Sequence, residues 1–317
     1  MRKALLFCGI ALVLLACVAT IPAKHIYLKY RQSCEAIVVE GVYIYHLMSP
    51  NASIIRLTQD YEAVESVKLP FVHAESMTTD GEYLYVSEWR DSPRILRIAL
   101  ADFSEQDTLV LVYDTTATEL LLVDKYLYVS QGSRIAKINT ETWEQVGNLN
   151  TKRHVDDRDY FLESLDTENG YLYVSSAFGH ARLLKIDLSS FTVTNATILT
   201  ETRCEGLAVK DGYGYVVCST SPGTIIKVKL ETLAEVDELV FSPGWNEPKS
   251  GVTVNGNNLY CLCTQGLVTI DLETFTEIET REIKLGGREG LAVVDGIVYT
   301  APYAPLNIMD IIRGELR

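Results

Sequence analysis

Glutamate recurs at a fixed distance before a tyrosine along this chain. The interval is ten residues in five segments, with the glutamates at Glu35, Glu75, Glu163, Glu205 and Glu289. A sixth, Glu119, joins the series if the turn at Asp124-Lys125 has lost one residue. Carboxylates that a fold brings close together must take up protons, bind a cation or pair with basic groups. The series therefore indicates cation chemistry, provided that the fold gathers these residues.

The tyrosines mark a repeat that extends over residues 25–317. Seven units of 39 to 45 residues share an anchor tyrosine, at Tyr45, Tyr85, Tyr128, Tyr173, Tyr215, Tyr260 and Tyr299. Each unit reads as four short strands. A small apolar strand, an Asp-Gly or Asn-Gly turn and an alternating strand such as Tyr-Leu-Tyr-Val-Ser form a hairpin. Two further strands follow, joined by a Glu-Thr turn.

Four antiparallel strands per unit of this length are typical of a propeller blade. We predict an all-β fold, a seven-bladed β-propeller of four-stranded antiparallel blades. The last unit ends after a third strand at 306–312, and residues 25–30 alternate like a strand. The N-terminal strand is therefore expected to join the last blade and close the ring, which leaves no open sheet edge. Each anchor tyrosine should fill the wedge between blades, with its hydroxyl bonded to a backbone group.

The innermost strands of a propeller run parallel around its channel, so the glutamates should lie on one circle near one mouth. Hard cations such as Ca²⁺ prefer several oxygen ligands, and this makes the five regularly spaced glutamates candidate metal ligands. In the alternative, structural interpretation, they accept backbone N–H groups or pair with Arg203, Lys249 and Arg288. Loops on the same face supply further candidates for ligand binding: Trp89, Arg90, His154, His180 and Trp245. The two histidines could act as a base or a metal ligand.

The segments 128–142 and 260–274 resemble the YVTN-type β-propellers of surface-layer and other exported proteins. This resemblance implies the fold and no particular activity. Glu205-Gly-Leu-Ala-Val209 also resembles the strand start of gluconolactonase-like propellers, where a glutamate in that place binds a divalent metal. That likeness implies a metal-dependent hydrolase of the lactonase kind as an alternative function, with the ring of glutamates as metal ligands. The chain also resembles NHL-type propellers weakly.

The first residues resemble an export segment. Arg2 and Lys3 precede an uncharged run from Ala4 to Ile21, which is typical of a signal peptide or an N-terminal membrane or lipid anchor. We therefore divide the chain into such a segment at 1–24 and the propeller at 25–317, outside the cytoplasm. Two N-glycosylation acceptor patterns follow, Asn51-Ala52-Ser53 and Asn195-Ala196-Thr197.

Composition and missing motifs limit the function further. The net charge of −14 argues against binding nucleic acid. We expect the five cysteines after the N-terminal run to be mostly small buried apolar residues: Cys34, Cys204, Cys218, Cys261 and Cys263. The sequence contains no phosphate loop, nucleophile elbow or paired-histidine motif. The preferred interpretation is a module that binds a protein or small molecule through its Glu-lined channel face, without catalysis.

Overall fold

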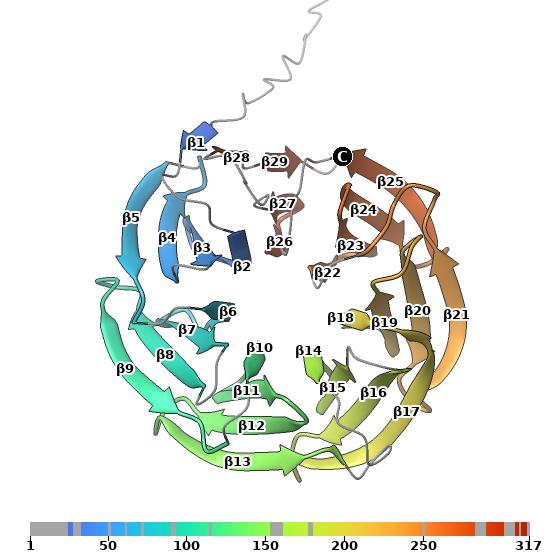
Figure 1. The fold of residues 1–317 in the computed structure, drawn as a ribbon, viewed down its shortest axis with the longest axis horizontal. Coiled ribbons are helices and arrows are strands. Elements are labelled where there is room, and N and C mark those ends of the chain that lie inside the picture. Colours follow the sequence, from blue (N-terminus) through green and yellow to red (C-terminus); the bar gives the residue numbers. More distant parts are fainter. Residues whose placement is uncertain are drawn as a thin grey trace, which may run out of the picture.

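In the computed structural model the chain forms a ring of β-sheets (Figure 1). The structure describes residues 25–27, 33–49, 52–60, 62–70, 73–89, 93–113, 116–152, 161–176, 180–248, 251–282, 290–300, 308–310 and 312–315. The predicted export segment at 1–24 lies outside these ranges and stays a prediction. Within them, no helix is long and apolar enough to cross a membrane.

Six four-stranded antiparallel sheets, blades 1 to 6 in chain order, surround the ring axis (Figure 1). Blades 1 and 2 comprise β2 (Ser33–Glu40), β3 (Tyr43–Ser49), β4 (Ser53–Thr58), β5 (Ala63–Lys68), then β6 (Ala74–Thr79), β7 (Tyr83–Glu88), β8 (Arg94–Ala99), β9 (Glu105–Val110). Blades 3 and 4 comprise β10 (Ala117–Val123), β11 (Tyr126–Gln131), β12 (Arg134–Asn139), β13 (Glu144–Asn150), then β14 (Leu162–Glu168), β15 (Tyr171–Ser176), β16 (His180–Asp187), β17 (Thr192–Thr202). Blades 5 and 6 comprise β18 (Cys204–Lys210), β19 (Tyr213–Cys218), β20 (Thr224–Lys229), β21 (Ala234–Val240), then β22 (Val252–Asn255), β23 (Asn258–Cys263), β24 (Gly266–Asp271), β25 (Thr276–Glu282).

The seventh repeat does not form a four-stranded blade. It is a three-stranded sheet of β26 (Leu291–Val294), β27 (Ile297–Thr300) and β29 (Ile312–Glu315). The N-terminal strand β1 (His25–Tyr27) pairs with β28 (Ile308–Asp310) in a separate two-stranded sheet. The prediction of seven four-stranded blades closed by the N-terminal strand is therefore wrong, because the described residues form six. The cause is the register of the last repeat. The strand β27 pairs with residues 312–315, at the end of the predicted third strand and beyond it. Residues 308–310, which were expected to pair with β27, instead pair with β1 in the separate sheet.

The predicted Asp-Gly and Asn-Gly turns are present at the hairpins. Both residues have positive φ at Asn169-Gly170, Asp211-Gly212 and Asp295-Gly296, the requirement of the type I′ turn that matches the twist of a hairpin. The turn at Asp80-Gly81 differs, because there only the glycine has positive φ. Its aspartate instead accepts the N–H groups of Glu82 at 2.9 Å and Tyr83 at 2.7 Å.

The anchor tyrosines lie in the wedges between sheets, as predicted, and each is at most 3% exposed. In blades 1 to 5 the anchor packs on a residue of positive φ in the next blade, within its turn between the third and fourth strands. Tyr85 and Trp143, for example, have ring centroids 5.8 Å apart. The Tyr85 hydroxyl donates to Asp80 Oδ2 at 2.6 Å, so its partner is a side chain and not the predicted backbone group.

A cation on the third strand reinforces each of these wedges. Lys185 Nζ lies 4.1 Å from the ring centroid of Tyr171 and donates to the Leu230 carbonyl of the next blade at 3.1 Å. Cation–π contacts of this kind contribute roughly 0.5–1 kcal/mol at exposed sites and more when desolvated. The same two contacts recur at Arg56, Arg97 and Lys137, and Lys227 makes the cation–π contact with Tyr213. The repeat therefore specifies the contact between neighbouring blades as well as each blade.

Two cysteines depart from the predicted role. Cys204 and Cys218 are directly opposed on β18 and β19, with Cα atoms 3.8 Å apart, and form a disulfide. Cys34, Cys261 and Cys263 are buried, which confirms the expectation for those three.

Candidate functional site

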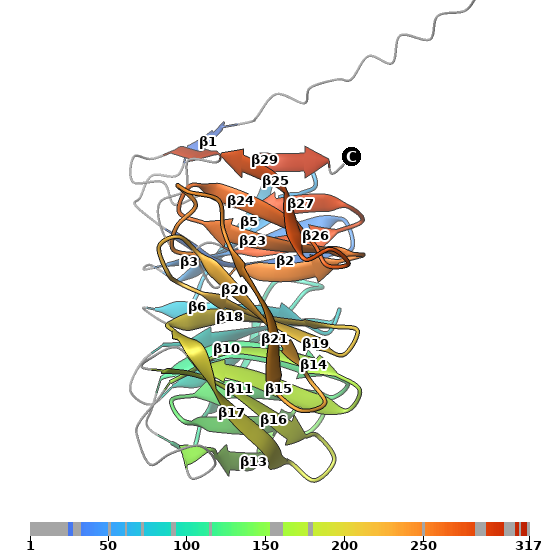
Figure 2. The ribbon, with the colours of Figure 1, turned by 90° about the vertical axis from the view of Figure 1, so that its right-hand side faces the viewer.

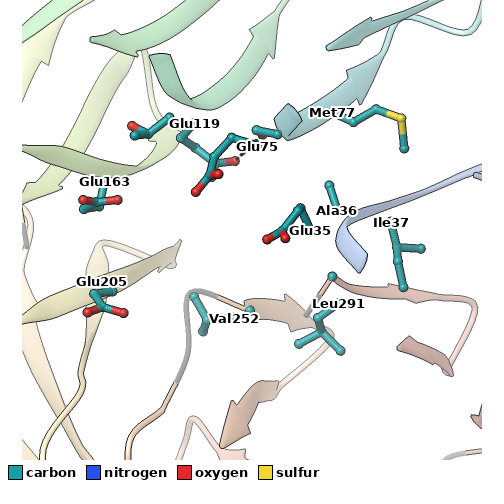
Figure 3. A pocket seen from close by; sticks show the side chains of 14 residues that line it. Glu35, Ala36, Ile37, Glu75, Met77, Glu119, Glu163, Glu205, Val252 and Leu291 are labelled. Atoms are coloured by element: carbon teal, nitrogen blue, oxygen red, sulfur yellow. Dashed lines mark hydrogen bonds between the residues drawn. The ribbon is translucent and has the colours of Figure 1, made fainter. Parts of the chain in front are cut away.

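Five of the six predicted glutamates line one cavity of about 180 Å³ at the channel mouth (Figure 3). They come from the innermost strands of five successive blades: Glu35 on β2, Glu75 on β6, Glu119 on β10, Glu163 on β14 and Glu205 on β18. We call this set the glutamate ring. Glu119 belongs to it, but the expectation of a shortened turn is wrong, because Asp124-Lys125 is a two-residue turn like Asn169-Gly170 and Glu119 lies at the strand position of Ser164. Glu289 lies outside the described residues.

A β-bulge positions four of the five members of the glutamate ring. In blades 1, 4 and 5 the pairing of the first and second strands shifts register at Glu35, Glu163 and Glu205, which are left without a residue opposite them. In blade 2 Glu75 lies in the equivalent shift, whereas in blade 3 the equivalent residue is Thr118, one position before Glu119. In blade 5, for instance, Cys204 pairs with Cys218 and Gly206 with Val217, so Glu205 is the extra residue. A bulge re-aims a side chain, and bulges are over-represented next to functional sites. Sequence reasoning found the glutamates and missed the bulges that place them.

Hydroxyl groups of blades 2 and 3 hold the backbone around Glu119. The Ser76 hydroxyl donates to Glu119 Oε1 at 3.3 Å and accepts the Leu120 N–H at 3.2 Å, which joins β6 to β10. The N–H of Glu119 itself donates to Ser130 Oγ at 2.8 Å. The Thr118 and Ser130 hydroxyls lie 2.6 Å apart. The carboxylate is thus fixed from two blades.

The glutamate ring is electrostatically strained at Glu119. Burial raises the pKa of Glu119 to about 8, and the nearby charges of Glu75 and Glu163 add to the increase. The hydrogen bond from Ser76 acts in the opposite direction. Near neutral pH this carboxyl group therefore holds a proton for most of the time. One of the three responses expected of crowded carboxylates, proton uptake, is present at this position.

An ion pair with a basic side chain is described for one member of the glutamate ring, Glu205, and it offsets the negative charge only weakly. Arg203 Nη2 lies 3.9 Å from Glu205 Oε1, and the Arg203 side chain is 62% exposed. An exposed ion pair at this distance is weak. Arg203 was one of the three predicted basic partners, while Lys249 and Arg288 lie outside the described residues.

Two of the loop residues predicted for the site, Trp89 and Trp245, are described by the structure, and neither lines the cavity. The Trp89 side chain is 45% exposed and lies edge-on to His73, with ring centroids 6.3 Å apart. Trp245 is partly buried against the apolar cluster between blades 5 and 6. Arg90, His154 and the side chain of His180 lie outside the described part of the chain.

A second cavity of about 420 Å³ adjoins the first and shares Glu119 and Val252 with it. Asp166 of β14 lines it and accepts the N–H groups of Val209 and Thr167, each at 2.7 Å. Burial raises the pKa of Asp166 to about 6. Sequence reasoning missed this residue because it belongs to one blade and not to the repeat, whose equivalent residue in blade 5 is Ala208.

Among the described residues, no three His, Cys, Asp or Glu side chains are grouped so that they could hold a metal ion. The five carboxylates come from five blades around the channel. The arrangement can present carboxylate oxygens to a positively charged group at the mouth.

Comparisons with known proteins support the fold. No family model matches the chain, and no curated protein matches it. Solved structures that resemble it are the WD40 β-propeller domain of Doa1 (12% identity, TM-score 0.72, covering 93% of this chain and 96% of that one) and U3-55K (14%, 0.73, 92% and 99%). The WD40 repeats of RRP9 are similar too (13%, 0.71, 92% and 98%). The chain is thus a β-propeller, and its resemblance to the YVTN-type family in particular gains no support.

Proposed function

We propose that this protein is an exported β-propeller that binds a positively charged group of a protein partner at its glutamate ring, without catalysis. One observation carries the proposal: five glutamates from five successive blades, four of them at β-bulges, line a single cavity. Packing alone does not require a repeated carboxylate at a channel mouth, since burying one costs free energy. A cationic group bound there relieves the mutual repulsion.

The size of the cavity defines what enters it. A volume of about 180 Å³ lies below the roughly 300–1,000 Å³ typical of pockets for drug-sized ligands. One lysine or arginine head group fits this space, and the adjoining cavity of about 420 Å³ shares Glu119 and Val252 with it. The rest of the partner would rest on the surrounding loops, where Trp89 and Phe161 are 45% and 43% exposed. Exposed aromatic side chains are enriched at interfaces.

Two features support export. The basic start and apolar run at 1–24 match an export segment. The Cys204–Cys218 disulfide fits an oxidising compartment, because disulfides are rare in the cytosol.

The test is titration of the full chain with a lysine-rich peptide, followed by fluorescence anisotropy. Glu163→Gln/Glu205→Gln should weaken binding at least tenfold and reduce its salt dependence, because two charges of the ring are removed. Glu231→Gln is the matched control, since Glu231 is exposed in the turn between β20 and β21 and pairs with Lys229. Equal binding by the ring variant and the control would contradict the proposal.

A calcium titration of the same samples separates two kinds of cation. Binding of the peptide that Ca²⁺ does not displace supports recognition of a side chain. A calcium-dependent rise in melting temperature that the ring variant loses would instead favour a metal site of the kind that the lactonase resemblance implies.

A further inference from the structure

Two positions on the outer rim depart from the pattern of the repeat, and one of them is an asparagine. Asn195 on β17 is paired with Lys185 on β16. In four other blades the equivalent residue of the outermost strand is acidic: Glu65, Asp107, Asp237 and Glu279. In blade 3 it is Gly147, opposite Lys137. In blade 1 this acid forms an ion pair of 2.5 Å with Arg56, its partner on the third strand. Blade 4 keeps the cation and replaces the acid with asparagine.

The contacts of Asn195 do not explain the replacement. Its Oδ1 accepts the N–H of the next residue, Ala196, at 2.9 Å. Its Nδ2 donates to the Thr232 carbonyl of blade 5 at 3.3 Å, a long hydrogen bond at an exposed site. Such a bond contributes little net stability, because water replaces it. An acidic residue would serve the sheet at least as well.

The surroundings of Asn195 suit a modification site. Asn195 and Thr197 are two residues apart on one strand, so both side chains project from the same face. The register shifts between Lys185 and Ile186, which places a bulge beside Asn195 on the β17 strand. The amide is exposed, and β17 is the outermost strand of its blade (Figures 1 and 2).

We propose that Asn195 carries an N-linked glycan, with Thr197 as the hydroxyl residue of its acceptor triplet. In the reaction the Asn195 amide nitrogen attacks the anomeric carbon of an oligosaccharide carried on a polyprenyl phosphate lipid. A C–N bond forms, the C–O bond to phosphate breaks, the lipid phosphate leaves with the electron pair, and the amide loses one proton. The step needs export, so this inference rests on that part of the proposed function.

A glycan at this place covers a surface that needs protection. At 11 residues β17 is the longest strand described, and its outer edge has no strand paired with it among the described residues. Unpaired edges invite pairing with another chain. Ile198, on the same strand, is 44% exposed. The rim lies away from the glutamate ring, so a glycan there leaves the channel mouth open (Figure 1).

The test uses the full chain, including residues 1–24, produced in cells whose secretory pathway attaches N-linked glycans. Asn51→Gln is the background, because it removes the other acceptor pattern. We expect a mass increase that peptide-N-glycosidase removes, with Asn195 converted to Asp in the released peptide. Thr197→Ala should abolish the increase, although Asn195 is still present, and the matched control Thr197→Ser should retain it.

Separate measurements distinguish this inference from the proposed function. Export is measured by the amount of chain outside the cell, and peptide binding by the titration described above. Asn195→Gln should leave peptide binding unchanged, since the site lies on the rim. An exported chain that stays unmodified at Asn195 overturns the inference, as does a mass increase that persists in Thr197→Ala. A chain retained in the cytoplasm overturns it together with the proposed export.

Discussion

Glu235 of blade 5 holds the end of blade 4 through Thr200, 35 residues earlier in the chain. One carboxylate oxygen accepts the Thr200 N–H at 2.7 Å and the other accepts its hydroxyl at 2.7 Å. Glu277 of blade 6 accepts the N–H and the hydroxyl of Ser242 in the same way, each at 2.6 Å, which links blade 6 to the end of blade 5. The acid is the fifth residue of the segments that begin Glu231-Thr and Glu273-Thr, so the repeat specifies this contact too.

Removal of this contact should weaken the ring. We expect Glu235→Ala to lower the free energy of unfolding by about 1 kcal/mol, because two charge-assisted hydrogen bonds are lost at an exposed site. Urea denaturation followed by tryptophan fluorescence measures the change. Glu238→Ala, at an exposed position of the same strand, is the control and should stay within about 0.5 kcal/mol of the parent. Equal values for the two variants would show that the contact carries no stability.

The disulfide offers a second test. Cys204 and Cys218 are 14 residues apart and close a short loop around the Asp211-Gly212 turn. A loop of about 15 residues is expected to contribute about 3 kcal/mol. Cys204→Ala/Cys218→Ala should lose stability of that order, and a reductant should destabilise the parent while leaving the variant unchanged. A parent protein insensitive to reductant would indicate that the two thiols are free.

The extent of sequence-based prediction differs between the fold and the site. The anchor tyrosines and the Asn-Gly and Asp-Gly turns were enough to define a propeller, because each has a local steric role that repeats. The number of blades was predicted wrongly, since the closing pairs of β1, β28 and β29 are long-range contacts whose register no local pattern specifies. The register in that segment decides whether β27 pairs with β28 or with β29, and so which strand is left for β1.

At the site, the sequence predicted the glutamates but not the β-bulges that direct four of their side chains into the cavity. The ten-residue interval is regular where the glutamate is the bulged residue, in blades 1, 2, 4 and 5, and an extra residue in one strand leaves no mark on composition. The Cys204–Cys218 pair was missed for a related reason. The two cysteines are almost equally distant from the turn that joins β18 to β19, and the bulge at Glu205 brings them opposite each other. That near-symmetry was the available signal.

A buried histidine makes the stability of the ring sensitive to acid. His46 is 1% exposed, and neither of its ring nitrogens has a hydrogen-bond partner among the described residues. Burial lowers the pKa of His46 to about 3. Because the pKa of the folded state lies below that of the unfolded chain, stability is complete above about pH 6.5 and declines as pH falls towards 3.

The other blades suggest the substitution that removes this sensitivity. Residues equivalent to His46 are Val86, Val129, Val174 and Val216. We expect the advantage of His46→Val over the parent in free energy of unfolding to be larger at pH 5 than at pH 7.5, by roughly 2 kcal/mol. The reason is that each pH unit below the pKa of the unfolded histidine costs the parent about 1.4 kcal/mol. Denaturant titrations at the two pH values measure this difference. A difference that does not depend on pH would rule out the buried neutral imidazole as its cause.

Glu119 has the opposite dependence on pH. Its pKa of about 8 lies above the ordinary value of 4.5, so between these pH values the folded state retains a proton that the unfolded chain has released. The stability that this group contributes is complete below about pH 4.5 and is lost as pH rises towards 8. Glu119→Gln keeps the neutral shape and removes the titration. At pH 8 the variant should be more stable than the parent by at least about 1.4 kcal/mol, with the two equal near pH 4.5.

The same proton should respond to ligand binding at the glutamate ring. A lysine head group placed among these carboxylates favours the charged form of Glu119, so peptide binding at pH 7 should release a proton to the buffer. Calorimetric heats measured in buffers of different ionisation enthalpy report that release directly. Glu119→Gln should bind the peptide without proton release, whereas Glu231→Gln should behave as the parent. Identical heats in all buffers for the parent would show that the peptide binds elsewhere than beside Glu119.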